Sequence, residues 1–407
     1  MPGGAPKPLV LWRFVITDLW GIPISMITNV ADTVQLEYQL NRPTVLTFNV
    51  PSEHKLVNIV HDDGDPYLAV GNRLVKGYRK VSTSSDELPA ATTNWTLKFV
   101  GRIWHIEDAG DSDTVNTAVT VVDPLHDCVS RLVRSASGDF QKHVSWWGPP
   151  AGTDTGDSII KDMIDRTNAC ALAPLLFDTG GTFDTCAYQT AGWDQAFIMP
   201  SIVTLTDTGT VDISLEYADY MDITQTDWTQ HAHLSAMPRL GSDKPAVIFG
   251  YAAPPQTVSQ FNRTVDMATF ANDVTLWGKT IAGHTAHEVD SASAAKYGAF
   301  EEASSLSDIN TLELIQMLAS EQLYLRSKPK DIVSITPLQG VSALPFDEWF
   351  LGDTVTVNVG RTPFPVTRES FHGVQRIYGF TLTVDADVGE RVDSLIVSAQ
   401  AESVTPS

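Results

Sequence analysis

The stretch "NWTLKFVGRIWHIED", residues 94–108, indicates the class of fold. As far as Phe99, apolar side chains alternate with polar ones, which is typical of a β-strand with one buried face. The alternation changes phase at Gly101, and Trp104 and Ile106 then continue it. A glycine at a phase change predicts a β-bulge, which bends a sheet toward a barrel.

Three neighbouring segments extend this pattern. "VQLEYQLN" (34–41) and "VLTFNVP" (45–51) both alternate, and Asn41, Arg42 and Pro43 provide turn residues between them. "TAVTVVDP" (117–124) adds a further strand. Together these segments predict an N-terminal β-barrel domain over residues 10–133.

The last third of the chain combines one helix with several strands. Within "NTLELIQMLASEQLYLRSKP" (310–329), apolar residues recur at helical spacing and predict a helix over residues 311–326. We therefore expect a C-terminal domain, residues 264–407, containing this helix and a second small β-barrel. The predicted strands are "ANDVTLWGKT" (271–280), "DIVSITP" (331–337), "DTVTVNVG" (353–360), "GFTLTV" (379–384) and "SLIVSAQ" (394–400).

The centre of the chain has a mixed pattern. "DSIIKDMIDRT" (157–167) predicts a helix, and "TGTVDISLEYADY" (208–220) contains a candidate strand. We expect a central mixed domain over residues 134–263, and a flexible Pro/Gly-rich arm over residues 1–9. The predicted fold class is α+β and β-rich, with two small β-barrel-like domains and mixed α/β material between them.

The charge of the chain excludes some functions. The formal net charge is −22, which disfavours stable binding of nucleic acid. Residues 167–238, here called the acidic segment, contain no Lys or Arg. This segment predicts either an ordinary acidic surface or a face that repels a polyanion. Its acids are Asp178, Asp184, Asp194, Asp207, Asp212, Glu216, Asp219, Asp222 and Asp227.

The chain contains no apolar run close to twenty residues, so we expect no membrane span. Cys128, Cys170 and Cys186 form no C-x-x-C pair, and we expect them to be buried free thiols. Sparse cysteine is consistent with assembly in a reducing cytoplasm. Of the adjacent Trp146 and Trp147, only one can face a core from an extended strand.

Several clusters of histidines or acids are candidate sites of chemistry. "HTAHE" lacks the H-E-x-x-H order of a zinc helix, so we expect a solvated loop there. None of the acidic clusters matches a calcium loop, so we expect acidic turns. We therefore assign no catalytic, metal or cofactor-binding residue and expect the chain not to be an enzyme. The residues considered are His231 and His233; His284, His287 and Glu288; Glu107, Asp108, Asp111 and Asp113; and Asp219, Asp222 and Asp227.

The order of motifs in the C-terminal half resembles that of tailed-phage baseplate hub proteins, the minor tail proteins of long-tailed phages (siphoviruses). The resemblance covers residues 10–132 and 270–400. The motifs in the C-terminal half are "ANDVTLWGKT", "DSASAAKYGAFEE", "LASEQLYLRSKPKDIVSITP", "LGDTVTVNVG" and "QRIYGFTLTVD". Those resembling the first hub barrel are "LNRPTVLTFNVP", "FVGRIWHIED" and "TVVDPLHDCVSRLV".

The resemblance implies a structural protein of the virion tail tip, assembled in the host cytoplasm. Family members form a homotrimeric ring that joins the sixfold distal tail protein and tail tube to a threefold tail fibre or tip protein. The tape measure protein and then the genomic DNA pass through the channel without specific binding. A carbohydrate-binding or cell-wall-degrading tail-tip protein is the alternative function.

Residues 291–295 are small and precede the predicted helix. We expect a loop there. It either approaches a neighbouring subunit or the channel wall, or lies on the surface without contacts.

Overall fold

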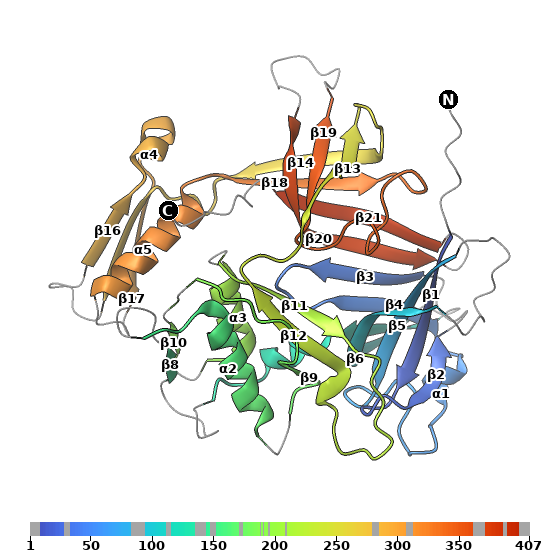
Figure 1. Cartoon of the computed structure of the whole chain (residues 1–407). Helices are drawn as coiled ribbons and strands as arrows, with labels where there is room; N and C mark the ends of the chain where they lie inside the picture. Colours follow the sequence, from blue (N-terminus) through green and yellow to red (C-terminus); the bar gives the residue numbers. More distant parts are fainter. Residues whose placement is uncertain are drawn as a thin grey trace. The chain divides into compact units, whose positions relative to one another are not determined.

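The structure is a computed structural model, in which strands predominate over helices (Figure 1), as the sequence predicts. Residues 1–8 of the predicted arm lie outside the described residues, whereas Leu9 already belongs to the first strand. The structure describes residues 9–27, 33–82, 94–110, 115–134, 144–146, 152–170, 174–187, 189, 191–193, 196–207, 210–278, 285–306, 312–360, 371–385 and 389–398.

The chain forms two compact units, and the backbone passes between them within strands β14 (Val258–Asp266) and β18 (Lys330–Pro337). The division does not test the predicted bounds at residues 133 and 263, which remain a prediction. Unit 1 comprises Met1–Gln260 and Ile335–Ile396, and unit 2 comprises Phe261–Ser334 and Val397–Ser407.

A 13-stranded sheet follows the order β14-β18-β21-β20-β3-β4-β7-β6-β5-β1-β2, and β19 pairs with both β20 and β13. The early strands are β1 (Leu9–Thr17), β2 (Pro23–Ile27), β3 (Thr33–Gln39), β4 (Val45–Pro51), β5 (Leu74–Ser82), β6 (Thr96–Gly110) and β7 (Val115–Val122). The late strands are β13 (Asp243–Tyr251), β14, β18, β19 (Thr354–Val359), β20 (Phe371–Asp385) and β21 (Gly389–Ser398).

The early and late strands are joined by one antiparallel pairing. Strand β3 pairs with β20 from Gln39 opposite Gly379 to Thr33 opposite Asp385. Across this junction, Tyr38 stacks on Phe380 with ring centroids 4.8 Å apart. The two sets of strands that alternation predicts are therefore parts of one hydrogen-bonded sheet.

The predicted hairpin of β3 and β4 is confirmed. Leu36 lies opposite Leu46 and Val34 lies opposite Phe48, and all four side chains are buried. Asn41, in the turn, adopts a φ of 59°, a left-handed conformation that asparagine tolerates better than most residues.

The predicted bulge at Gly101 is wrong in position. Strand β6 has an extra residue at Lys98 opposite β5, and another at Trp104 opposite β7. Gly101 lies between them, and a Cβ there would come within 2.5 Å of the Phe99 ring and 2.7 Å of the Val122 carbonyl oxygen. Glycine is therefore needed for close packing. Because of the second bulge, Trp104 is 39% exposed rather than buried.

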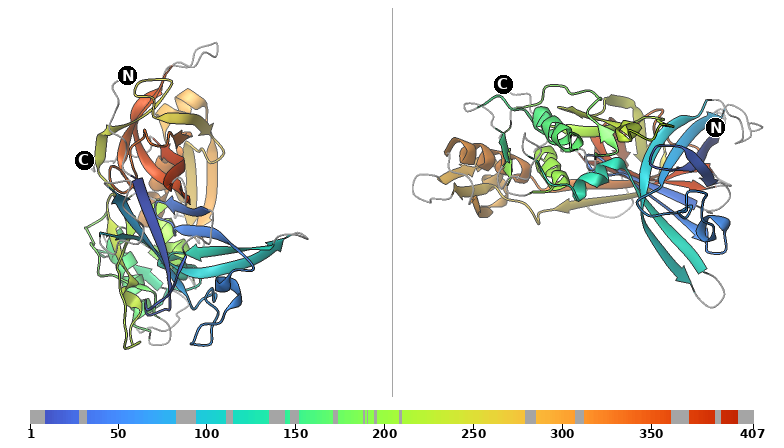
Figure 2. Two further views of the ribbon diagram at one scale, coloured as in Figure 1. Left: turned by 90° about the vertical axis from the view of Figure 1, so that its right-hand side faces the viewer. Right: turned by 90° about the horizontal axis from the view of Figure 1, so that it is seen from below.

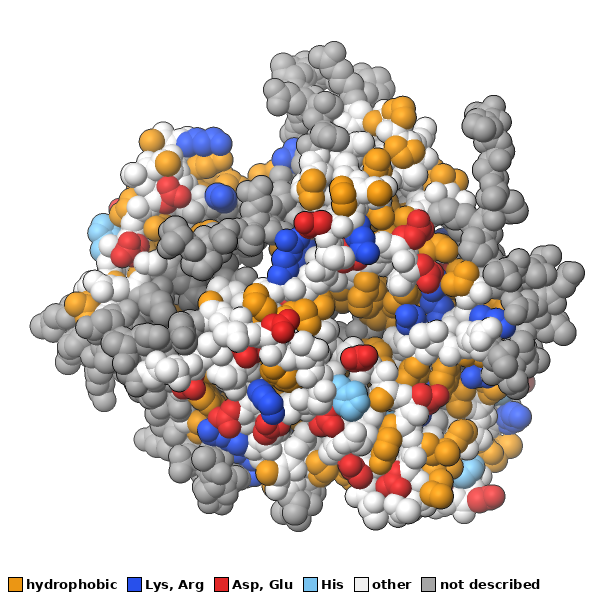
Figure 3. All heavy atoms as spheres, viewed as in Figure 1, with side chains coloured by type: hydrophobic (Ala, Val, Ile, Leu, Met, Phe, Trp, Pro, Cys, Tyr) orange, Lys and Arg blue, Asp and Glu red, His pale blue; other side chains and the backbone are white. Residues whose placement is uncertain are grey.

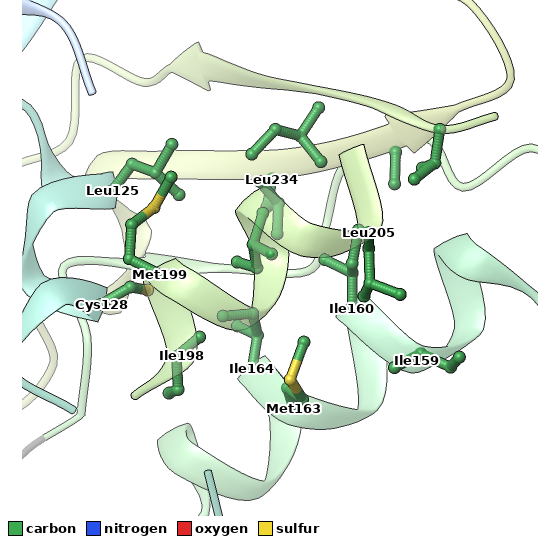
Figure 4. Packing of buried hydrophobic residues seen from close by; sticks show 14 of the residues in the cluster. Leu125, Cys128, Ile159, Ile160, Met163, Ile164, Ile198, Met199, Leu205 and Leu234 are labelled. Atoms are coloured by element: carbon green, nitrogen blue, oxygen red, sulfur yellow. The ribbon is translucent and has the colours of Figure 1, made fainter. Parts of the chain in front are cut away.

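The central part of unit 1 packs two helices against a small sheet. Helix α2 (Gly156–Asn168) confirms the predicted helix, whereas α3 (Ile198–Asp207) was not predicted. Figure 4 shows their apolar side chains gathered with those of η1 (Pro124–Val129) and β12. One small sheet has the order β11-β12-β9 and another pairs β10 with β8. The strands are β8 (Val144–Trp146), β9 (Phe177–Asp178), β10 (Ala191–Trp193), β11 (Asp212–Tyr217) and β12 (Ala232–Met237). Two short helices, α1 (Lys55–Asn58) and η2 (Thr229–His231), complete unit 1.

Unit 2 contains a three-stranded sheet in the order β16-β15-β17, with helix α5 packed against it (Figure 1). Helix α5 (Leu312–Arg326) confirms the predicted helix. The buried core of unit 2 contains Ala271, Val274, Leu276, Ala286, Ile315 and Ala319. The strands are β15 (Asp273–Gly278), β16 (Thr285–Val289) and β17 (Glu301–Leu306).

The predicted loop at residues 291–295 is wrong, because Ser291–Tyr297 form helix α4. The Asp290 carboxylate accepts a hydrogen bond from the Ser293 backbone N–H at 2.9 Å and caps the helix. Gly298, with a φ of 85°, ends it. The small residues are thus helix-forming residues between a cap and a stop.

Candidate functional site

The histidines considered as ligands do not converge. In the part of the chain that the structure describes, no group of three or more His, Cys, Asp or Glu residues is placed to hold a metal ion. The predicted loop around His287 is instead strand β16, where His287 Nε2 lies 2.7 Å from Asp273 Oδ1. Glu288 is adjacent on the strand and therefore projects to the opposite face. His284 lies outside the described residues.

His231 and His233 have different partners. His233 Nδ1 lies 2.6 Å from Asp178 Oδ1, whereas His231 Nε2 lies 2.8 Å from the Leu19 carbonyl oxygen. His231 is fully buried, and its Nδ1 has no hydrogen-bond partner. Burial lowers the pKa of His231 to about 4, and the nearby Lys76 ammonium also acts to lower it. His231 is therefore neutral near pH 7 and fastens η2 to the turn before β2.

Asp219, in the acidic segment, is engaged by two side chains of β5. The buried Lys76 Nζ lies 3.1 Å from Asp219 Oδ1 and also donates to the Tyr220 carbonyl oxygen at 2.7 Å. The Tyr78 hydroxyl donates to the same Oδ1 at 2.7 Å. Burial acts to raise the pKa of Asp219, but the Tyr78 hydrogen bond and Lys76 lower it below its usual value.

Asp212 links the central part of unit 1 to the large sheet. It is buried and forms an ion pair with Arg376 of β20. Its carboxylate also accepts from Asn41 Nδ2 at 3.1 Å and from the Leu240 backbone N–H at 2.7 Å. Arg376 donates in addition to the carbonyl oxygens of Gly352 and Leu240, at 3.2 and 3.1 Å. The pair is thus satisfied on both sides, as a buried ion pair requires.

Asp222 stabilises its own loop by accepting hydrogen bonds from residues that follow it. Its carboxylate accepts hydrogen bonds from the backbone N–H groups of Thr224, Thr226 and Asp227, at 2.8, 2.8 and 3.0 Å. The hydrogen bond from the Thr224 hydroxyl is the main cause that lowers the pKa of Asp222. This is the acidic turn that the sequence predicts. Ile223, at the tip of this loop, is 77% exposed.

The other acidic cluster lies on a strand rather than in a turn, so that prediction is wrong for the residues that the structure describes. Glu107 and Asp108 belong to β6, and Asp108 Oδ1 accepts from the Thr117 hydroxyl at 2.6 Å. Asp111 and Asp113 lie outside the described residues.

The acidic segment is therefore more than a solvated surface. Several of its carboxylates hold cations supplied by distant parts of the chain, and on the face shown in Figure 3 carboxylate and cationic side chains are interspersed. The pairs are Asp207 with Arg42, Asp212 with Arg376 and Asp219 with Lys76.

A second buried ion pair connects β5 with β21. Arg79 Nε lies 2.7 Å from Glu390 Oε2, and both side chains are almost completely buried. Trp12 Nε1 donates to the same carboxylate at 2.7 Å, and Arg79 Nη2, which also donates to Glu390, lies 2.7 Å from Asp347 Oδ2. The Arg79 guanidinium also lies 5.3 Å from the centre of the Phe346 ring. Because the partners are 311 positions apart, no local pattern indicates this site.

Two of the three cysteines are buried, and all three are free, as predicted. Burial raises the pKa of the Cys186 thiol to about 12, so it is protonated at neutral pH. Cys170 is partly exposed rather than buried. Trp146 is buried and donates to Asp162 Oδ2 at 2.6 Å, whereas Trp147 lies outside the described residues.

Within the described residues, no helix combines the length and apolar character needed to cross a membrane.

Comparison with protein-family models gives no match, and comparison with curated proteins gives none either. Solved structures do match over almost the whole chain. The 43 kDa tail protein of prophage MuSo2 from Shewanella oneidensis has a TM-score of 0.55 at 10% identity, covering 96% of this chain and 98% of that one. A tail protein from Neisseria meningitidis MC58 has a TM-score of 0.52 at 9% identity, covering 95% and 96%. Prophage tail protein gp18 from Listeria monocytogenes EGD-e has a TM-score of 0.51 at 10% identity, covering 96% and 95%.

At these identities the likeness concerns the fold. It includes the central residues 134–263, for which the sequence indicates no relative. The resemblance to phage tail proteins that the motifs indicate is thereby confirmed in three dimensions: the chain has the fold of prophage tail proteins.

Proposed function

We propose that this chain is the structural baseplate hub, or minor tail protein, at the tail tip of a long-tailed bacteriophage. Three copies form a ring that joins the sixfold tail tube to the threefold tail tip. The observation that carries this proposal is the fold shared with tail proteins over almost the full length of both chains, 96% and 98% for the Shewanella protein.

The sheet of unit 1 supports this role. A ring that joins threefold and sixfold partners needs two similar β-rich faces in each subunit, held in a fixed relation. The pairing of β3 with β20 and the buried ion pair of Arg79 with Glu390 both tie early strands to late ones. Breaking a buried pair of this kind costs about 3–5 kcal/mol, so the pair holds the early and late strands in a fixed relation.

The charge supports passage of DNA. A net charge of −22 repels phosphate, so the genome passes without binding to the wall. Because the net charge already counts every Lys and Arg, the internal ion pairs leave it unchanged, and the exposed carboxylates supply the repulsion. The proposed partners are the distal tail protein, the tail tube, the tail fibre or tip protein and the tape measure protein.

No enzymatic reaction is part of the proposal. The groups with the most unusual environments, His231 and the two buried ion pairs, all hold elements of the fold together. None of them combines a nucleophile with a base, the arrangement that hydrolysis at a tail tip requires.

The test is the mass of the purified full-length protein in solution, measured by light scattering, alongside zymography on host cell walls and glycan-array binding. We expect three copies per particle, no cleared zone and no glycan signal. Monomers at every concentration would overturn the ring. A cleared zone abolished by one carboxylate or histidine substitution would establish the cell-wall-degrading alternative, and specific glycan binding would establish the carbohydrate-binding one.

A further inference from the structure

Arg13 of β1 is a cation held in place by two aromatic rings. Its guanidinium carbon lies 4.9 Å from the centre of the Tyr78 ring and 4.9 Å from that of the Trp95 ring. Tyr78 lies directly opposite on β5, and its hydroxyl is fixed by the hydrogen bond to Asp219. Arg13, Tyr78 and Trp95 are here called the Arg13 socket.

The Arg13 guanidinium is not satisfied by the residues that the structure describes. Across the described residues it makes no hydrogen bond or ion pair, and its Nε is buried without a hydrogen-bond partner. Asp219, whose pKa the Arg13 charge helps to lower, is already engaged by Lys76 and Tyr78. Because Nε is buried, the donors left for an anion are the four N–H groups on the two Nη atoms, which lie in a plane that matches a carboxylate, and stacking on rings restricts the motion of the guanidinium. The socket is therefore arranged to receive an anion from outside the chain.

A group of opposite charge lies on β6, at the end of the strand that is far from Trp95. Pairing of β6 with β5 ends at Arg102, and from His105 to Gly110 the described pairing of β6 is with β7 alone. Figure 2 shows β6 and β7 extending together away from the rest of unit 1. Residues 105–110 of β6 are here called the acidic arm.

The acidic arm presents two exposed carboxylates. Glu107 has no ion-pair or hydrogen-bond partner among the described residues, and Asp108 is oriented by the Thr117 hydroxyl. No described strand pairs with the edge of residues 105–110 that faces away from β7, and an edge of this kind can accept a further strand.

The socket and the arm cannot meet within one chain. Trp95 directly precedes β6 and Glu107 lies 12 residues further along the same strand, so at about 3.3 Å per residue the two are about 40 Å apart along β6. Two complementary surfaces at opposite ends of one subunit can form a head-to-tail contact, and such contacts close into a ring when the rotation between subunits closes.

We propose that the acidic arm of one copy of this chain docks in the Arg13 socket of a second copy. The Glu107 carboxylate of one copy binds the Arg13 guanidinium of the next, Asp108 on the opposite face of β6 adds negative charge to the arm, and the edge of β6 that faces away from β7 adds backbone hydrogen bonds. This inference rests on the proposed ring and assigns the residues of its subunit contact.

The test uses full-length protein in analytical ultracentrifugation at physiological salt. R13E and the double variant E107K/D108K are each expected to raise the dissociation constant at least about tenfold, because like charges then meet at the contact. The combined variant R13E/E107K/D108K restores opposite charges and is expected to assemble like the wild type. The control E216K/E301K changes the net charge by the same amount as E107K/D108K, but at two exposed acids outside the acidic arm, and is expected to assemble like the wild type.

A second measurement does not depend on affinity. R13C and E107C are combined in a background carrying C170S, which removes the partly exposed native thiol. Mild oxidation is expected to give bands of disulfide-linked chains on a non-reducing gel. R13C alone or E107C alone is expected to give fewer of these bands.

The outcomes separate this inference from the ring itself. A monomeric wild-type protein overturns the proposed function. A wild-type ring whose assembly is unchanged in R13E or in E107K/D108K overturns the docking of arm and socket and leaves the ring standing. Failure of the combined variant to assemble, or the absence of linked chains on oxidation, also overturns the docking.

Discussion

Replacing Asp212 by Asn probes the link between the central part of unit 1 and the large sheet. The substitution keeps the size of the side chain and removes its charge. The positive charge of Arg376 is then left buried, still hydrogen-bonded to the carbonyl oxygens of Gly352 and Leu240 but without its carboxylate. Asn41 Nδ2 donates to Oδ1 and the Leu240 backbone N–H donates to Oδ2, and the asparagine amide keeps only one of these two acceptors.

The expected loss follows from burial. The exposed fractions of the Asp212 and Arg376 side chains are 5% and 10%, so solvent screens the pair little. Removing one partner of a buried pair costs about 3–5 kcal/mol, because the remaining charge stays desolvated. The control is D207N in the same acidic segment. Its pair with Arg42 has an Asp207 side chain that is 59% exposed, and such pairs contribute about 0–1 kcal/mol.

The assay is urea unfolding at pH 7, followed by tryptophan fluorescence. All tryptophans except Trp277 lie in unit 1, so the signal reports mainly on that unit. The midpoint is expected to fall strongly in D212N and hardly at all in D207N. Equal, small shifts in both variants would refute the assignment of the Asp212–Arg376 pair as a structural link.

The pH dependence of stability is expected to report on His231, because its pKa is about 4 in the folded chain and 6.5 in the unfolded one. Neutral His231 therefore contributes to the free energy of unfolding fully above pH 6.5. This contribution, up to about 3 kcal/mol, is lost as the pH falls toward 4. H231Q places its amide nitrogen near the position of Nε2, keeps a donor for the Leu19 carbonyl oxygen and is expected to flatten this slope in urea unfolding between pH 7 and 4. An unchanged slope would contradict the assignment. G101A is expected to cost about 1–3 kcal/mol, because the new methyl group meets the Phe99 ring. G373A is the control, since the nearest atom to its Cβ is a flexible side-chain nitrogen at 3.4 Å, and thermal melting that fails to distinguish the two variants would count against the packing argument.

Elements with strong periodicity could be predicted from the sequence. The alternation in β3 and β4 requires one buried face, and the 3.6-residue spacing in α2 and α5 requires one apolar stripe. In each of these elements the residues that determine the structure are close together in the chain.

Other elements were missed although the sequence contains their signals. Asp290 and Gly298 mark the start and the end of α4, but the Ser and Ala residues between them have no apolar stripe and resemble a loop. Gly101 is a different case, because its requirement for glycine depends on a ring two residues away folding across it, which strand periodicity does not describe.

The charged contacts could not be predicted from short stretches of the sequence. Asp212 and Arg376 are 164 positions apart, and Arg79 and Glu390 are 311 apart. Composition indicates an acidic segment, but only the fold reveals which of its carboxylates meet a cation. The Arg13 socket likewise depends on β1, β5 and the residue before β6 lying side by side.

The most direct test of the central claim is an electron cryomicroscopy map of the assembled full-length protein. The account predicts a threefold ring with an open axial channel whose wall carries carboxylates, and with each β6–β7 hairpin reaching the next subunit. Solitary monomers, or a channel lined by arginine and lysine, would contradict it.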